Sequence, residues 1–260
     1  MRFGVVRFPG SCDERDALLA AARVGDTELL WHADRDLHGV DAVIVPGGFS
    51  YGDYLRVGAI ARFAPVMASV LDFAREGGPV LGICNGFQVL CEAGLLPGAL
   101  LPNTSLRFVC RQVEVEVVNP ETAFTRACAP GDRLSIPVKH TTGRYYATEP
   151  VDERQVVLRY APGHNPNGSQ DDIAGVSNAE GNVLGLMPHP EHAVDPLTGS
   201  ADGHAATARA TRWNSLRPSA EPVSSSTACS GWGIRPSTLP ASLVTPAISR
   251  TEPLGLWPAA

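Results

Sequence analysis

Lysine is almost absent from this chain of 260 residues: Lys139 is the single lysine, and arginine supplies the other basic side chains. The formal net charge is -6 at pH 7, and no stretch gathers enough basic residues to neutralise phosphate groups. We therefore expect neither nucleic acid nor an anionic membrane surface among the partners of this protein.

Long apolar segments are missing as well. The N-terminal stretch MRFGVVRFPG lacks the apolar core of a signal peptide, and no segment approaches the ~20 apolar residues of a membrane-spanning helix. The six cysteines form no CxxC pair and follow no regular spacing, so we interpret them as free thiols. Together these absences predict a cytoplasmic protein.

Motifs for nucleotides and metals are not found either. The sequence contains no GxxxxGK[ST] phosphate-binding loop, so we expect no ATP site of its own. Its histidines and cysteines are scattered without ligand spacing, which argues against a metal site.

Strand and helix patterns alternate in the first part of the chain. Residues 2–8, 41–45 and 79–83 have the composition of strands, whereas 13–24 and 57–75 carry apolar residues at helical spacing. This alternation predicts an α/β fold with a mostly parallel central sheet and helices on both faces. In such sheets the functional sites lie at the carboxyl ends of the strands.

After residue 101 the pattern changes to strands alone. The segment FVCRQVEVEVV at 108–118 alternates apolar and polar residues, as a half-buried antiparallel strand does. We therefore expect an added antiparallel region. The remaining strand candidates are 134–139, 155–160, 173–176 and 182–187, and the segments 140–146 and 161–168 between them have the composition of loops.

A cysteine lies at the joint between a strand and a helix in PVLGICNGFQVL. Gly82, Cys84 and Gly86 form a G-x-C-x-G sequence, the thiol counterpart of the turn that presents the serine nucleophile of many hydrolases. The start of a helix favours a thiolate through its unpaired N–H groups and its dipole. Cys84 is therefore a candidate nucleophile, although a buried structural cysteine is an alternative interpretation.

A second glycine turn, Pro46-Gly47-Gly48, follows the strand at 41–45. In a parallel sheet both turns lie at the same edge, so a backbone N–H near Gly48 and that of Asn85 are predicted to bind an oxyanion.

The sequence PHPEH follows the last predicted strand. A cysteine nucleophile needs a base and a carboxylate that orients this base. His189 and Glu191 supply both, and in an extended segment their side chains would point to one side while that of His192 would point away. The alternative is a surface turn rich in proline and histidine.

These motifs together resemble the class I, triad-type glutamine amidotransferases. The resemblance rests on GxCxGxQ at 82–88, the Pro-Gly-Gly turn and the HPE sequence at 189–191. Within that family, GGFSYGDYLRVGAIARF, NPNGSQDDIAGV and GNVLGLMPHPEHAV are similar to the glutaminase subunits of phosphoribosylformylglycinamidine synthase. The similarity extends from residue 2 to about residue 203.

The resemblance implies a flavodoxin-like fold and a reaction. Cys84 would form a thioester with glutamine, His189 would transfer the protons, Glu191 would orient the histidine, and Gln88 would contact the bound glutamine. No cofactor would be bound by this chain. Ammonia would pass to a large synthase subunit that uses ATP and Mg²⁺, and a small accessory subunit would complete the assembly.

Two other functions remain open at this point: hydrolysis of a different γ-glutamyl substrate, and a non-catalytic subunit. The composition changes after Gly203, since residues 205–260 contain no Lys, Asp, Phe or Tyr and seven prolines. We therefore predict an amidotransferase domain at 1–204 and a disordered tail at 205–260.

Overall fold

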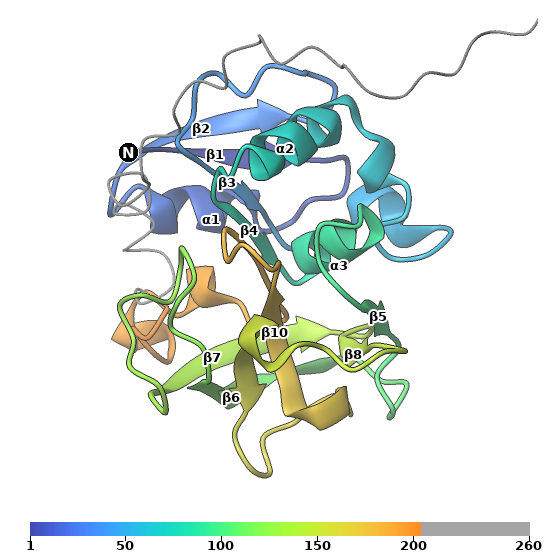
Figure 1. Ribbon diagram of the computed structural model, residues 1–260, viewed down its shortest axis with the longest axis vertical. Helices are drawn as coiled ribbons and strands as arrows, with labels where there is room; N and C mark the ends of the chain where they lie inside the picture. The colour runs from blue at the N-terminus through green and yellow to red at the C-terminus, as the bar shows by residue number, and fades with distance from the viewer. Residues whose placement is uncertain (204–260) are drawn as a thin grey trace, which may run out of the picture. The chain divides into compact units, whose positions relative to one another are not determined.

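The computed structural model describes residues 1–203 (Figure 1). None of the helices in this part of the chain is both long and apolar enough to cross a membrane. The predicted domain boundary at residue 204 and the predicted tail lie outside the described residues.

One sheet of nine strands runs through the described part of the chain, in the order β2-β1-β3-β4-β11-β10-β9-β6-β7. The first five of these strands pair in parallel and the last four continue the sheet as antiparallel neighbours. The strands are β1 (Arg2–Arg7), β2 (Asp26–Trp31), β3 (Ala42–Val45), β4 (Val80–Ile83), β6 (Val109–Val117), β7 (Arg133–His140), β9 (Val156–Tyr160), β10 (Ile173–Ser177) and β11 (Val183–Leu186), while β5 (Ala99–Leu101) and β8 (Arg144–Tyr146) form a separate pair.

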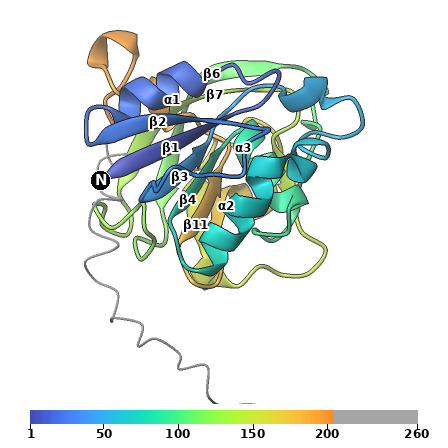
Figure 2. The same ribbon diagram turned by 90° about the horizontal axis from the view of Figure 1, so that it is seen from above.

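Helices cover both faces of the parallel half. Helix α1 (Glu14–Ala21) lies on one face, and α2 (Pro65–Arg75) and α3 (Asn85–Glu92) lie on the other (Figure 2). The connection from β1 through α1 to β2 and the connection from β3 through α2 to β4 run in opposite directions along the sheet. Because crossover connections between parallel strands are right-handed, their helices lie on opposite faces. The strands β3, β4 and β11 are buried along their whole length, which explains their continuous apolar sequences.

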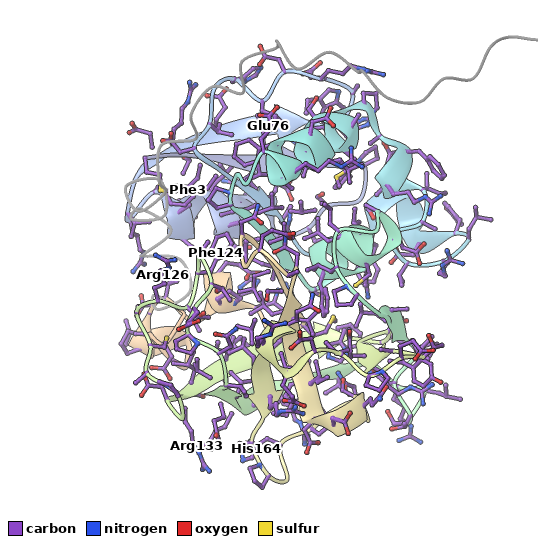
Figure 3. All side chains as sticks on the ribbon, in the orientation of Figure 1. Phe3, Glu76, Phe124, Arg126, Arg133 and His164 are labelled. Atoms are coloured by element: carbon purple, nitrogen blue, oxygen red, sulfur yellow. The ribbon has the colours of Figure 1, made fainter. Side chains whose placement is uncertain are left out.

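The antiparallel half returns to the ends of the parallel strands. The backbone N–H of His189, just after β11, donates to the Pro137 carbonyl oxygen in β7 at 2.8 Å. The last strand of the sheet is thereby held beside the carboxyl end of β11. Apolar side chains such as Phe3 and Phe124 are buried in the interior, whereas the charged or polar side chains of Arg133 and His164 lie at the lower surface in this view (Figure 3).

The predicted fold class is confirmed, but one helix boundary was wrong. Only Pro65–Arg75 of the predicted helix at 57–75 forms an α-helix. Gly58 has a φ of +76°, and Ala64 is extended because the ring of the following proline disfavours helical backbone there. The predicted loop at 140–146 also contains the short strand β8.

The glycines around Cys84 allow close packing at the joint between β4 and α3. A Cβ atom added to Gly86 would lie 1.8 Å from the backbone carbonyl oxygen of Val45 in β3. A Cβ on Gly82 would lie 2.5 Å from Leu90 Cδ1 and 2.9 Å from the backbone of Gly86. The start of α3 can therefore touch the neighbouring strand only without side chains at these positions.

We predict that Gly86→Ala lowers the free energy of unfolding by about 3 kcal/mol in urea denaturation, because backbone must move to admit the new methyl group. Helix propensity alone would favour alanine by about 1 kcal/mol. Gly163→Ala is the control: this glycine has a φ of +80° but open space around it, so the loss should be about 1 kcal/mol. A harmless Gly86→Ala substitution would contradict the packing argument.

Candidate active site

Four parallel strands end at one place in the molecule. β1 leads to the loop that carries Asp13, β3 to the Gly47-Gly48 turn, β4 to Cys84 and β11 to His189. The site thus lies at the carboxyl edge of the sheet, as the sequence predicted. It is next to β1, where the strand order changes direction: β2 lies on one side of β1 and β3 on the other.

Cys84 occupies a strained turn. Its φ of 51° and ψ of -104° lie outside the regions that side chains ordinarily allow. Its N–H donates to the Leu186 carbonyl oxygen at 2.8 Å, and helix α3 begins at the next residue. The turn therefore places Cys84 Sγ at a helix N-terminus and on the wall of a pocket.

The Gly47–Gly48 peptide has a fixed orientation. Two backbone N–H groups, those of Cys12 and Asp13, donate to the Gly47 carbonyl oxygen at 3.2 and 3.3 Å. Because C=O and N–H point in opposite directions in a trans peptide, the Gly48 N–H is directed away from the Cys12 loop. Gly48 lines the same pocket as Cys84. Its φ of +145° is available to glycine at little cost.

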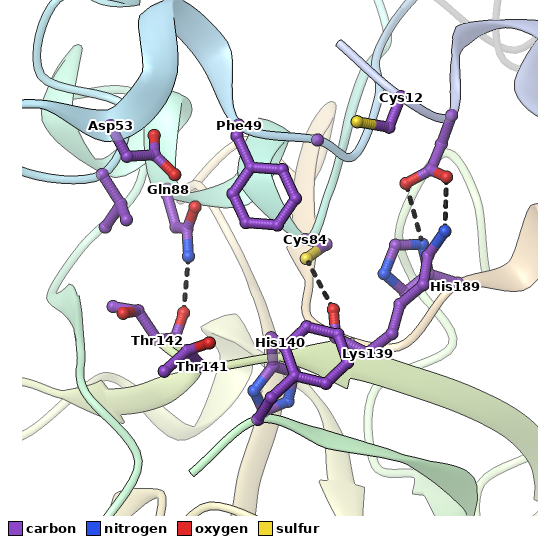
Figure 4. Close-up of a pocket in the computed structure, with 14 residues that line it drawn as sticks. Cys12, Phe49, Asp53, Cys84, Gln88, Lys139, His140, Thr141, Thr142 and His189 are labelled. Carbon is purple, nitrogen blue, oxygen red and sulfur yellow. Dashed lines mark hydrogen bonds and ion pairs between the residues drawn. The ribbon is translucent and has the colours of Figure 1, made fainter. Parts of the chain in front are cut away.

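His189 and Glu191 form a buried pair. His189 Nδ1 lies 2.6 Å from Glu191 Oε1, and each side chain is 1% exposed. His189 Nε2 has no hydrogen-bond partner among residues 1–203. The edge of the ring that Glu191 does not use faces Cys84 (Figure 4). One ring nitrogen is thus held by a carboxylate and the other is available for proton transfer.

Charge decides the protonation of His189. Burial of the imidazole acts to lower its pKa, but the negative charges of Glu191 and Cys84 outweigh burial and raise the pKa of His189 to about 10. The arrangement therefore favours an imidazolium at His189.

The conformation predicted for the PHPEH segment was wrong. Pro190–His192 is a 3₁₀ turn, and His192 does not point away. Its Nε2 lies 3.5 Å from Glu191 Oε1 and 3.4 Å from Asp13 Oδ1. The tighter turn brings both histidines to the same carboxylates, with ring centroids 5.4 Å apart.

The ligand atoms of Asp13, His189, Glu191 and His192 lie within 4.8 Å of one another, the spacing of a cation site. However, the ammonium group of Lys139 already pairs with Asp13 Oδ1, and Glu191 holds the imidazole. Positive charge from the protein thus occupies this cluster, which does not favour a metal ion.

A pocket lies at this edge of the sheet. Cys84 and His189 line one side, and Gln88, Thr141 and Thr142 line the other (Figure 4). Gln88 is buried: its Nε2 donates to the Thr142 carbonyl oxygen and its Oε1 accepts from Asn85 Nδ2 at 2.8 Å. Four of the six predicted site residues, Gly48, Cys84, Gln88 and His189, line the pocket. The other two lie behind them, since Asn85 is hydrogen-bonded to Gln88 and Glu191 to His189.

Comparison with known proteins gives the family of this site. Residues 1–218 match the model of the CobB/CobQ-like glutamine amidotransferase domain. The chain belongs to this glutamine amidotransferase family. It is 63% identical over 209 residues to the phosphoribosylformylglycinamidine synthase subunit PurQ of Rubrobacter xylanophilus, covering 78% of this chain and 94% of the relative.

Two further relatives agree. The subunit of the same name from Mycolicibacterium paratuberculosis is 60% identical over 207 residues, which are 77% of this chain and 92% of the relative. The structure of PurLQS from Thermotoga maritima contains a chain that matches with a TM-score of 0.77 and 43% identity, covering 83% of this chain and 99% of that one. The predicted family is confirmed.

A buried polar network supports one wall of the amidotransferase pocket. Asn103 Nδ2 donates to the carbonyl oxygens of Arg107 and His140, so Asn103 Oδ1 is the acceptor for Gly143 N–H and for His140 Nδ1. His140 Nε2 then faces Asn167 Nδ2 at 3.4 Å. The amide donor of Asn167 requires an unprotonated Nε2, and burial lowers the pKa of His140 to about 4. The network holds the loop that carries Thr141 and Thr142.

Three functional candidates were missed from the sequence. Asp13 and Lys139 form an ion pair beside His189, and Asp53 lines the pocket near Gln88. Burial raises the pKa of Asp53, which is otherwise lowered by hydrogen bonds from the Gly58 backbone and Asn85. Two features of the sequence could have indicated them: Lys139 is the single lysine of the chain, and Asp53 lies within the GGFSYGDYLR motif.

We predict that acid weakens this amidotransferase through His140. The unfolded chain takes up a proton at the histidine's ordinary pKa of 6.5, whereas the folded chain does so only near pH 4. The contribution is absent above pH 6.5 and grows to about 3 kcal/mol of destabilisation as the pH falls to 4. Urea denaturation at pH 7 and at pH 4.5 measures this difference.

The matched control is His140→Asn, which keeps a donor for Asn103 but does not titrate. This variant should be less stable than the parent at pH 7 and should lose most of the decline between the two pH values. His189 is present in both proteins, so the effect of its own raised pKa is the same in each and cancels in the comparison. An equal decline in both proteins would refute the role of His140.

Proposed function

We propose that this chain is the glutaminase subunit of phosphoribosylformylglycinamidine synthase, working in the cytoplasm. The observation that carries the proposal is the arrangement of Cys84 on a strained turn with a buried His189–Glu191 pair beside it. The names of the relatives at 63% and 60% identity supply the pathway.

The reaction follows from the positions of these groups. Cys84 Sγ attacks the side-chain amide carbon of glutamine, and the amide oxygen becomes an oxyanion that accepts hydrogen bonds from the N–H groups of Gly48 and Asn85. His189 gives its proton to the leaving nitrogen, so ammonia departs and a thioester remains. His189 then takes a proton from water, which attacks the thioester and releases glutamate. Glu191 keeps the imidazole oriented through both steps.

Glutamine specificity is assigned to the opposite side of the pocket. Gln88 is held by Asn85 and by the Thr142 carbonyl, which leaves its amide in one orientation toward the substrate. The carboxyl group of Asp53 lines the same side and is the group of suitable charge for the α-ammonium of an amino acid. A pocket with these groups at one end and Cys84 at the other fits an amino acid with a side-chain amide.

The partner subunits are part of the proposal. The chain contains no phosphate-binding loop, so ATP and Mg²⁺ are assigned to a large synthase subunit, and a small accessory subunit completes the complex. Phe49 and Phe108 line the pocket while each remains 54% exposed, and Tyr54 and Leu55 in the segment after Phe49 are more than 80% exposed. Such apolar groups at and near the active site favour a protein partner that receives ammonia there.

The experiment that tests the chemistry is glutamate release by the chain with its large synthase subunit. Cys84→Ala should abolish glutamine hydrolysis, because the turn between β4 and α3 carries no other thiol. His189→Ala should lose most of the rate, and Glu191→Gln should give an intermediate rate, since an orienting group contributes less than the base it orients.

The control is synthase activity with added ammonia, which should survive in all three variants. Retained glutamine hydrolysis in Cys84→Ala would contradict the assignment of Cys84 as the nucleophile. No hydrolysis by the parent chain under any condition would favour a non-catalytic subunit, and hydrolysis of other γ-glutamyl compounds in preference to glutamine would favour a different hydrolase.

A further inference from the structure

The single lysine of the chain lies in the active site. Lys139 lines the pocket, and its backbone carbonyl oxygen is 3.8 Å from Cys84 Sγ. Its ammonium group pairs with Asp13 Oδ1, whose side chain is 4% exposed. The mechanism above uses neither of these charged groups.

Asp13 is packed against the catalytic histidine. Its Oδ2 lies 3.7 Å from His189 Nδ1, the nitrogen that Glu191 also holds. A Cβ atom on Gly47 would lie 2.3 Å from Asp13 Oδ2 and 2.8 Å from His189 Cε1, so the glycine leaves room for this contact. The backbone of Asp13 also helps to fix the Gly47 peptide.

The charges around His189 do not balance without Lys139. Besides His192, which contacts both carboxylates, the imidazole of His189 lies between the buried side chains of Asp13 and Glu191 and can neutralise only one of them. Lys139 neutralises the other and lies close enough to Cys84 to interact with its negative charge. The hydrogen bond and the charge of Asp13 outweigh burial and raise the pKa of Lys139, so it keeps its proton.

We propose that Asp13 and Lys139 form a positioning pair whose two charges set the pH range in which Cys84 and His189 exist as thiolate and imidazolium. The inference rests on the proposed function and deepens it: the two charged side chains take no part as reactants in that mechanism and act on Cys84 and His189 through their charges.

The sign of each effect follows from electrostatics. Without the positive charge of Lys139, the Cys84 thiolate is harder to form and the His189 imidazolium is harder to deprotonate, so the active range moves to higher pH. Without the negative charge of Asp13, both changes are reversed and the range moves to lower pH. Removal of both charges should restore a range near that of the parent.

Other ionisable groups face the same cluster, and none of these residues is substituted in the variants compared. Cys12 lines the pocket near Asp13, His140 lies beyond Lys139, and His192 and Glu191 contact Asp13 and His189 from the 3₁₀ turn. The charge of Asp13 is kept by its hydrogen bonds with His192 and Lys139, which overcome burial and hold the pKa of its carboxyl group well below the ordinary value.

The test measures the thiolate directly. The full chain is treated with iodoacetamide at a series of pH values, and alkylation at Cys84 is read by fragment mass spectrometry. Lys139→Met should raise the pH of half-maximal reactivity by roughly 1 unit or more, and Asp13→Asn should lower it by a similar amount. The double variant should lie within a few tenths of a unit of the parent, and Lys139→Arg should resemble the parent.

The control is Arg159→Met, which removes a basic side chain paired with Glu153 outside the pocket and should leave the profile unchanged. Lys139 is one third exposed, so its variants are expected to fold, and circular dichroism checks this. Unshifted profiles in folded Lys139→Met and Asp13→Asn would overturn the proposal. Because alkylation needs no glutamine turnover, this failure is distinguishable from failure of the proposed function.

A second measurement uses the single lysine. With ε-¹³C-lysine, the full chain gives one lysine side-chain NMR signal, that of Lys139. This signal should shift in the pH range where Cys84 titrates, and the shift should disappear in Cys84→Ser. A signal that does not respond to Cys84 would also refute the coupling.

Discussion

The backbone conformation of Cys84 is the constraint on which the rest of the site depends. A φ of 51° is costly for a residue with a side chain and persists only where the surrounding structure enforces it. The enforcement comes from close packing, because Gly86 touches the Val45 carbonyl and leaves the first turn of α3 no room to relax. The same packing brings the β3 turn, and with it Gly48, to the pocket that Cys84 lines.

The parallel half of the fold was predictable because its strands and helices have local signals. The apolar segments of β1, β3, β4 and β11 and the glycines around Cys84 indicate both the elements and the edge at which they meet. The chemistry of the site followed from that edge, since strand ends that are distant in sequence become neighbours there. Cys84 and His189 were identified in this way.

What the sequence could not show depends on contacts between distant segments. Nothing local to Lys139 indicates that β7, the last strand of the sheet, lies beside the carboxyl end of β11. Its pairing with Asp13, 126 residues earlier, is a product of that topology. The conformation of His189 to His192 was misjudged because two prolines are compatible with both an extended segment and a 3₁₀ turn, and only the buried carboxylates favour the turn.

The two hydrogen bonds to the Gly47 carbonyl have an electronic consequence as well as a geometric one. A peptide group whose oxygen accepts hydrogen bonds is polarised, and its own N–H becomes a stronger donor, by about 10–30% per bond. The donors from Cys12 and Asp13 therefore strengthen the Gly48 N–H at the far end of the same peptide. The loop after β1 thus contributes to oxyanion binding through the π-electrons of a single amide, although none of its own N–H groups has to reach the substrate.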